Sequence, residues 1–265
     1  MCLILFAHRV HADLPLVVAA NRDEFHGRPT AAAAWWQDQP ALLAGRDLKD
    51  GGTWIGVGRD GRFAAVTNFS EEPPAPSVAA RSRGELTTGF LTGTQSPGAF
   101  LAEIAQRADQ YRGFNLLVGD GRELHYLCNR NGGARALPPG VYGLSNSVLD
   151  CTWPKVVTGR QELASAIASL RGVALSRALF ALLGHRDVAP DEQLPGLERG
   201  LEVARRVSPR FIVNDNYGTR ASTVLIARRS TPGELALTYA EHSFGPNARD
   251  DGRVDYELTW AVPPE

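Results

Sequence analysis

The chain of 265 residues has only three cysteines, one methionine and almost no net charge. The cysteines, Cys2, Cys128 and Cys151, are odd in number and irregularly spaced. This argues against a disulfide framework and indicates a reducing compartment. The formal net charge is −1 and the basic residues are scattered. We therefore expect no binding to nucleic acid or to an anionic membrane surface.

The sequence also lacks an apolar run long enough to span a bilayer. The apolar stretch at the N-terminus ends at His8 and Arg9, and no basic residue precedes it, unlike a signal peptide. These absences predict a cytoplasmic protein without a membrane span. Apolar residues make up 43% of the chain, which is enough for a sizeable core. The length fits one large domain or two small ones.

Hydrophobic periodicity predicts three groups of strands separated by two groups of helices. The expected strands cover residues 2–10, 15–23, 51–58, 61–69, 114–120, 123–129, 140–147, 218–230, 233–244 and 254–262. The expected helices cover residues 81–93, 96–111, 154–185 and a short segment within 197–207. The proline-rich segment 70–80 is expected to be a loop. This order lacks strict βαβ alternation and favours an α+β fold of antiparallel sheets covered by helices.

Two motifs that suggest a cofactor or a metal have simpler explanations. Gly56, Gly58 and Gly61 fit the pattern G-x-G-x-x-G, but a strand pattern follows them where a dinucleotide site needs a helix. These glycines are expected to shape a hairpin. His8 and His11 are three residues apart, so on a strand they face opposite sides. No cluster with zinc spacing and no G-x-S-x-G elbow is present, and we expect no metal site.

Cys2 begins the first predicted strand, and two interpretations of it are open. It can be a small apolar residue that starts the strand. If Met1 is removed, however, Cys2 carries both a thiol and the α-amine of the chain, whose ordinary pKa is about 8. That pair is a nucleophile with its own base.

Polar residues close the second predicted strand in the sequence "NRDEF". A strand end in solvent would explain them. A hairpin that begins at residue 2 also brings this strand end beside Cys2. There Asp23 could orient the α-amine and Arg22 could lower the pKa of the thiol.

Three further strand features point to the same chemistry. Asn68 and Asn146 each follow an apolar strand, and Arg220 lies inside a third. Asparagine is a common turn residue, but its amide can also donate to a developing oxyanion. An arginine inside a strand needs either a partner or solvent. The set of features carries more weight than any single member.

Six motifs in this order resemble the NRDE family, also called the Transport and Golgi organization protein 2 family. They are "MC" at the start, then "NRDEF", "GGTWIGV", "VTNF", "GLSNS" and "YGTRAST". The resemblance spans nearly the whole chain and implies a single domain over residues 1–265. It also implies the four-layer αββα sandwich of the N-terminal nucleophile (Ntn) hydrolases.

More distantly, the chain is similar to the cysteine Ntn amidases that cleave bile salts and penicillin V. That resemblance implies a catalytic set of nucleophile, amine-holding aspartate, two oxyanion asparagines and a nearby arginine. The matching positions are Cys2, Asp23, Asn68, Asn146 and Arg220.

The arginine that precedes the aspartate differs from the pattern in those amidases. They have it three residues before the aspartate, where this chain has Ala20, whereas here Arg22 is adjacent to Asp23. The two positions have the same strand parity, so Arg22 can face the same side. They differ by about 7 Å along the strand.

The resemblance leaves two main functions open, both with a small-molecule ligand. The first is a cysteine Ntn amidase that acts on a C–N (amide) bond, with Arg22 and Arg220 favouring the thiolate or holding an acidic substrate. The second is a haem-binding or haem-trafficking protein that uses the same cleft without hydrolysis, since members of the family are implicated in haem trafficking. A third possibility is a fold kept only for protein contacts. The oligomeric state is open.

Haem would need an apolar groove, an axial ligand and cations for its propionates. Trp35, Trp36 and Trp54, together with arginines and with Cys2 or a histidine, could supply these groups. The sequence has no C-x-x-C-H motif, so a bound haem would be non-covalent. Hydrolysis by Cys2 needs no cofactor.

Overall fold

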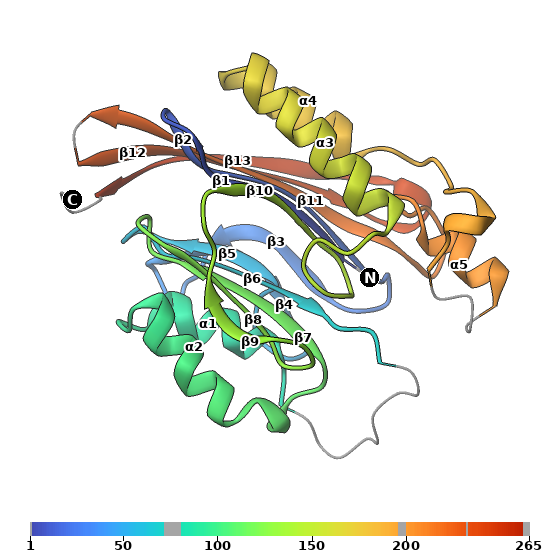
Figure 1. The fold of residues 1–265 in the computed structure, drawn as a ribbon, viewed down its shortest axis with the longest axis horizontal. Coiled ribbons are helices and arrows are strands. Elements are labelled where there is room, and N and C mark those ends of the chain that lie inside the picture. The colour runs from blue at the N-terminus through green and yellow to red at the C-terminus, as the bar shows by residue number, and fades with distance from the viewer. Residues whose placement is uncertain (1, 72–80, 196–199, 232, 262–265) are drawn as a thin grey trace.

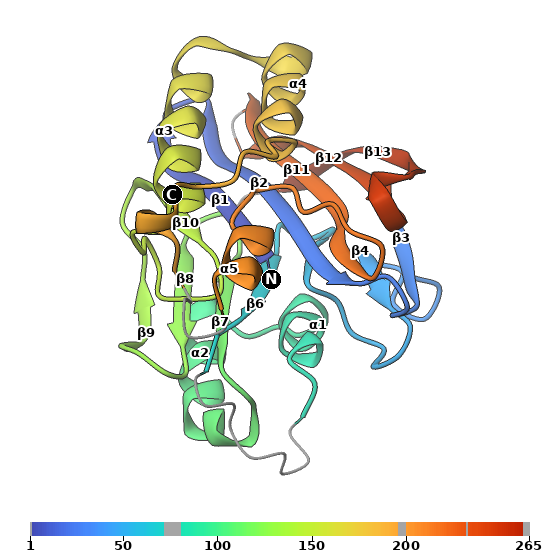
Figure 2. The ribbon, with the colours of Figure 1, turned by 90° about the vertical axis from the view of Figure 1, so that its right-hand side faces the viewer.

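Two antiparallel sheets pack face to face in the computed structural model, with helices on both outer faces (Figure 1). The structure describes residues 2–71, 81–195, 200–231 and 233–261. Most of the proline-rich segment 70–80 that was expected to be a loop therefore lies outside the described residues. The N-terminus lies at the end of the sandwich that faces the viewer in Figure 2.

The first sheet has six strands in the order β10-β1-β2-β11-β12-β13. Their bounds are β1 Cys2–His11, β2 Leu14–Phe25, β10 Gly140–Leu144, β11 Tyr217–Thr231, β12 Glu234–Phe244 and β13 Asp250–Ala261. β1 and β2 form the predicted N-terminal hairpin, in which Cys2 lies opposite Arg22. β2 continues through the polar motif to Phe25 because β11 pairs with it along that length.

The second sheet has seven strands that follow one another in chain order. Their bounds are β3 Thr30–Trp35, β4 Leu42–Asp47, β5 Ile55–Gly58, β6 Phe63–Asn68, β7 Phe114–Gly119, β8 Leu124–Cys128 and β9 Gly133–Ala136. The sequence analysis missed β3, β4 and β9. β3 is mostly alanine, which has low β propensity, so pairing with β4 decides its conformation.

The predicted hairpin at the G-x-G-x-x-G motif is confirmed. β5 and β6 pair in antiparallel register, and Gly61 lies in the connecting turn with φ +90°. Glycine adopts this conformation without steric cost. A strand, and not a helix, follows the motif, so no helix N-terminus is available there for a phosphate.

Two pairs of helices cover the outer faces of the two sheets, and one further short helix of the described chain lies at the end of the sandwich near the N-terminus (Figure 2). Their bounds are α1 Gly84–Thr92, α2 Pro97–Gln106, α3 Pro154–Ser169, α4 Gly172–Leu183 and α5 Leu201–Val207, with 3₁₀ helices at Ala108–Gln110, Asp191–Gln193 and Pro246–Ala248. α2 begins as predicted, since Ser96 accepts a hydrogen bond from the Ala99 N–H and Pro97 is at its first position. The helical segment 154–185 breaks before Gly172, whose φ is +53°.

Three apolar layers hold the four layers of secondary structure together. Along β1, Ile4 and Phe6 face the second sheet, and Leu3 and Leu5 pack under α3 and α4. A third cluster, which includes Phe90, joins α1 and α2 to the second sheet. The predicted α+β class and four-layer αββα sandwich are therefore confirmed. None of the helices in the described part of the chain has both the length and the apolar composition to cross a bilayer.

Candidate functional site

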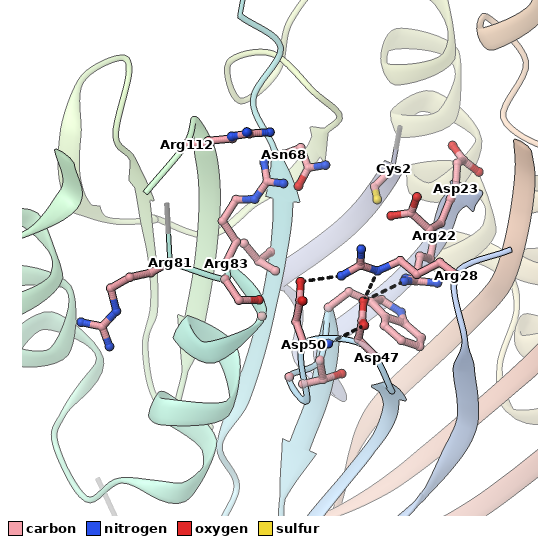
Figure 3. A pocket seen from close by; sticks show the side chains of 17 residues that line it. Cys2, Arg22, Asp23, Arg28, Asp47, Asp50, Asn68, Arg81, Arg83 and Arg112 are labelled. Carbon is pink, nitrogen blue, oxygen red and sulfur yellow. Dashed lines mark hydrogen bonds and ion pairs between the residues drawn. The ribbon is translucent and has the colours of Figure 1, made fainter. Parts of the chain in front are cut away.

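A cavity of about 490 Å³ opens between the two sheets where β1 begins. Four of the residues predicted from the sequence line it, namely Cys2, Arg22, Asp23 and Asn68. Cys2 has the strand parity of Ile4, and in Figure 3 its sulfur points into the cavity. The residue as a whole is partly exposed, and its thiol is free of any disulfide.

Asn146 links the two sheets beside this thiol. Its Oδ1 accepts a hydrogen bond from the main-chain nitrogen of Cys2 at 2.8 Å, and its Nδ2 donates to the main-chain oxygen of Asn68 at 2.8 Å. Ser145 Oγ donates to the main-chain oxygen of Cys2 at 2.8 Å. The start of β1 is thereby fixed against the ends of β6 and β10.

The thiol of Cys2 does not have the lowered pKa that the sequence analysis considered. Burial raises the pKa of Cys2, and the negative charge of Asp23 acts in the same direction. Arg22 opposes this rise with a smaller effect. Deprotonation of Cys2 therefore requires a base rather than a neighbouring arginine alone.

Asp23 is buried on the neighbouring strand, with 4% of its surface exposed. Its Oδ1 accepts a hydrogen bond from Thr219 Oγ1 at 2.7 Å, and Thr219 Oγ1 accepts one from the Ile212 N–H at 2.9 Å. Burial raises the pKa of the Asp23 carboxyl, while the charge of Lys155 and the bond from Thr219 oppose the rise. The carboxylate is therefore held in one orientation.

Lys155 is a residue of this site that the sequence analysis missed. It is 5% exposed, and its Nζ donates to the main-chain oxygen of Val207 at 2.9 Å. Burial lowers its pKa, and the charges of Asp23 and Cys2 act against that lowering. The helical spacing of the sequence could have indicated it. Lys155 comes four residues before Gly159 and eight before Leu163, so all three lie on the buried face of α3.

Arg22 lies on the cavity side, as its strand parity predicts, but its charge is already paired. Its Nη2 lies 3.3 Å from Asp47 Oδ2, and its guanidinium lies over the ring of Trp54 at 4.4 Å. Arg28 Nε contacts the same Asp47 oxygen at 2.5 Å. Burial acts to raise the pKa of Asp47. The hydrogen bond and the charge of Arg28 outweigh that effect, so the pKa of Asp47 lies below its ordinary value. The guanidinium of Arg22 is therefore held between Asp47 and the ring of Trp54.

Arg220 is not among the residues that line the cavity. Its guanidinium donates to the main-chain oxygens of Phe25 at 3.0 Å, Arg28 at 3.1 Å and Phe244 at 3.3 Å. It therefore fixes the turn after β2. Among the described residues, the Arg220 guanidinium thus contacts main-chain oxygens and not the Cys2 thiol, and its suggested contact with a substrate stays a prediction.

The three tryptophans named for a haem groove do not lie together. Only Trp54 lines the cavity. Trp36 is buried with its indole N–H bonded to the Ala44 carbonyl at 3.0 Å, and Trp35 lies under Arg59 at 3.7 Å. The cavity walls are mainly charged and include no histidine from the described residues. The lining thus does not fit a haem macrocycle, which needs apolar walls.

Metal ligation finds no support either. Nowhere in residues 2–71, 81–195, 200–231 and 233–261 are three or more histidine, cysteine or acidic side chains grouped to hold a metal ion. The chemistry available in the cavity is that of a thiol, a buried carboxylate, amides and guanidinium groups.

Among solved structures, the fold is similar to two proteins of low sequence identity. One is the Caenorhabditis elegans N-acylethanolamine-hydrolyzing acid amidase ortholog, with a TM-score of 0.43 and 11% identity over 85% of this chain and 92% of that chain. The other is the mutant C2A conjugated bile acid hydrolase from Clostridium perfringens, with a TM-score of 0.44 and 10% identity over 97% and 92%.

Sequence relatives are much nearer. The Transport and Golgi organization protein 2 homologs of Bos taurus and Homo sapiens are 36% and 34% identical, each over 80% of this chain and 81% of the relative. The Drosophila melanogaster protein of that name is 28% identical over 85% and 87%. The family model "Transport and Golgi organisation 2" matches residues 1–245. The chain therefore belongs to the Transport and Golgi organisation 2 family.

Proposed function

We propose that this protein is a cysteine hydrolase of the Ntn type that cleaves an amide C–N bond, with Cys2 as the nucleophile after removal of Met1. One observation carries the proposal. The Cys2 thiol faces a cavity while the nitrogen of the same residue is held by Asn146 at 2.8 Å. Removal of Met1 would turn that nitrogen into an α-amine beside the thiol.

The α-amine acts as the base in the first step. It takes the proton of the Cys2 thiol, through a water molecule, and the thiolate attacks the carbonyl carbon of the substrate. The base is needed because burial keeps the pKa of this thiol high. Asp23 and Asn146 orient the amine, and Asp23 stabilises the ammonium ion that forms.

The side-chain amide of Asn68 donates to the oxyanion of the tetrahedral intermediate. Asn68 lines the cavity, and its side chain makes no hydrogen bond with the described residues, so its N–H groups are available. One N–H of Asn146 Nδ2 donates to the Asn68 carbonyl, and Oδ1 accepts from the Cys2 nitrogen. We therefore assign Asn146 the role of positioning Cys2.

Collapse of the intermediate completes the cycle. The ammonium gives its proton to the leaving nitrogen, the C–N bond breaks, and an amine leaves a thioester on Cys2. Water then attacks the thioester with the α-amine again as base. This releases a carboxylic acid and restores the thiol.

The alternative function, haem binding, has weaker support. Cys2 and several arginines line the cavity, but its described lining is mainly charged and offers few apolar side chains for the macrocycle. Titration of haemin into the protein, followed by its absorbance spectrum, distinguishes the two functions. A spectral shift that Cys2→Ala abolishes would favour haem as the ligand.

The test of the hydrolase is trapping of the acyl-enzyme. Purified protein is incubated with a panel of small amides, quenched in acid and analysed by mass spectrometry. We expect an acyl adduct on Cys2 and loss of both adduct and turnover in Cys2→Ala. Cys151→Ala is the matched control, since Cys151 is buried outside the cavity and should leave turnover intact. Full turnover by Cys2→Ala would refute the mechanism.

A further inference from the structure

Two arginines of the cavity lie together on the far side of Asn68 from Cys2. Arg83 comes just before α1, and Arg112 lies between α2 and β7. In Figure 3 both guanidinium groups extend toward Asn68, which stands between them and the sulfur of Cys2. Both residues line the cavity.

The other arginines of the cavity have carboxylate partners. Arg22 and Arg28 pair with Asp47, and Arg81 Nε lies 2.5 Å from Glu85 Oε1. In contrast, Arg83 donates to a carbonyl, that of Gly113 at 3.2 Å. Within the described residues, no carboxylate forms an ion pair with Arg83 or with Arg112.

Two acidic residues lie near this pair, but within the described chain neither forms an ion pair with it. Glu24 also lines the cavity, but its carboxylate accepts a hydrogen bond from the Phe25 N–H at 2.8 Å. Glu71 forms an ion pair with Arg130. The pair of guanidinium groups therefore remains open to a ligand.

The electrostatics of the pair are unfavourable without an anion. Burial lowers the pKa of Arg83, and the positive charge of Arg112 lowers it further. The negative charges of Cys2 and Glu24 raise this pKa, but their effects are smaller. Two like charges close together, one of them partly buried, are stabilised when an anionic group lies between them. Guanidinium groups match the oxygens of carboxylate and phosphate with paired hydrogen bonds.

The position of the pair fits a part of the substrate beyond the reacting bond. Arg83, Arg112 and Asn68 also line a neighbouring cavity of about 600 Å³, whose walls include Phe69 and Tyr217. A ligand that reacts at Cys2 and extends past Asn68 would therefore reach both guanidinium groups.

We infer that Arg83 and Arg112 form a binding subsite for an anionic oxygen group, a carboxylate or a phosphate, carried by the substrate. The inference rests on the proposed function, since it takes Cys2 as the reacting group. It narrows the substrates to amides that bear such a negative charge.

The test compares two alkylating reagents that differ in charge. Iodoacetate, which is anionic, and iodoacetamide, which is neutral, both alkylate Cys2. The rate constant for iodoacetate is divided by that for iodoacetamide, and this ratio is divided by the same ratio measured for N-acetylcysteine. We expect a normalised ratio of about ten or more, so that the anionic reagent is clearly preferred. It should fall about tenfold in Arg83→Gln, because tenfold corresponds to one charge-assisted hydrogen bond. Any change that the variant makes to the thiol itself affects both reagents alike and therefore cancels in the ratio.

Three variants separate anion binding from a structural role. Arg112→Gln removes an exposed side chain without a partner in the described residues, so the fold is kept and the ratio should fall. Arg83→Lys keeps the charge and should retain most of the ratio. Arg81→Gln, the matched control, removes an arginine of the same cavity that is already paired, and the ratio should not change. Equal ratios in wild type, Arg83→Gln and Arg112→Gln would overturn the inference.

A calorimetric titration of Cys2→Ser protein keeps this test independent of hydrolysis. The probes are N-acetylglycine, neutral N-acetylglycinamide and inorganic phosphate. Binding of N-acetylglycine alone assigns the subsite to carboxylate, and binding of phosphate alone assigns it to phosphate. In either case Arg83→Gln should abolish binding, even if no acyl-enzyme forms in wild type. Equal binding of the neutral amide, or no binding of either anion, would refute the subsite.

Discussion

Replacement of Glu241 by glutamine should stabilise the protein at neutral and alkaline pH. Glu241 lies on β12 with 1% of its surface exposed. Its Oε1 accepts a hydrogen bond from the Ala33 N–H at 2.7 Å, and its Oε2 accepts one from Thr223 Oγ1 at 3.2 Å. Burial raises the pKa of Glu241 from 4.5 to about 7, despite these two bonds.

The sign and size of the effect follow from this pKa. The folded state holds the proton of Glu241 more tightly than the unfolded chain does. Stability therefore falls as the pH rises from about 4.5 to about 7 and stays low above that. At about 1.4 kcal/mol for each pKa unit, the buried charge costs about 3 kcal/mol above pH 7. Glutamine avoids this cost and still accepts from the Ala33 N–H.

Urea denaturation of wild type and Glu241→Gln between pH 5 and pH 8 measures the difference directly. Other titrating groups act alike in both proteins, so they cancel in the comparison. The stabilisation by glutamine should grow by about 2.5 kcal/mol between pH 5 and pH 8. Glu257→Gln, an exposed control on β13, should change stability by less than about 0.5 kcal/mol. A pH-independent difference, or a less stable Glu241→Gln at pH 8, would refute the reasoning.

Three other changes test the site and its supports. Asn68→Ala should lower kcat on an amide substrate by about 100- to 1,000-fold with little change in KM, and an unchanged kcat excludes Asn68 as the oxyanion donor. Asp23→Asn should lower kcat by about 100-fold or more; wild-type kcat would show that the carboxylate does not act on the amine. Gly52→Ala should destabilise the protein by about 1–3 kcal/mol in urea, because its Cβ would lie 2.5 Å from the main-chain carbon of Gly84. Gly27→Ala is the control, because a Cβ there would have no atom within 4 Å, and it should leave stability unchanged. Equal losses of stability in the two variants would contradict this reasoning.

The part of the site that depends on a local hairpin could be predicted from the sequence. Cys2 and Arg22 face each other because β1 and β2 pair directly, and Asp23 follows on the same strand. Local patterns are sufficient there, since a short connection and alternating apolar residues determine the register. Asn68 and Asn146 were identified as strand-end residues, but only the family resemblance indicated that they share a site with Cys2.

The rest depends on contacts between distant segments. Arg220 is the extra residue of a bulge in β11, since Thr219 pairs with Asp23 and Ala221 pairs with Arg22. A bulge redirects one side chain and leaves no periodic signal in the sequence. Arg83 reaches the cavity because the start of α1 packs against Gly52, a close approach that composition and spacing do not reveal.

Intact mass spectrometry of the purified protein, before and after brief treatment with iodoacetamide, tests the central claim most directly. Peptide mapping then identifies which cysteine carries the adduct. The proposed mechanism predicts that Met1 is absent and that Cys2 is alkylated before Cys128 and Cys151, which are both buried. Retention of Met1, or a Cys2 that reacts no faster than the buried cysteines, would contradict the N-terminal nucleophile.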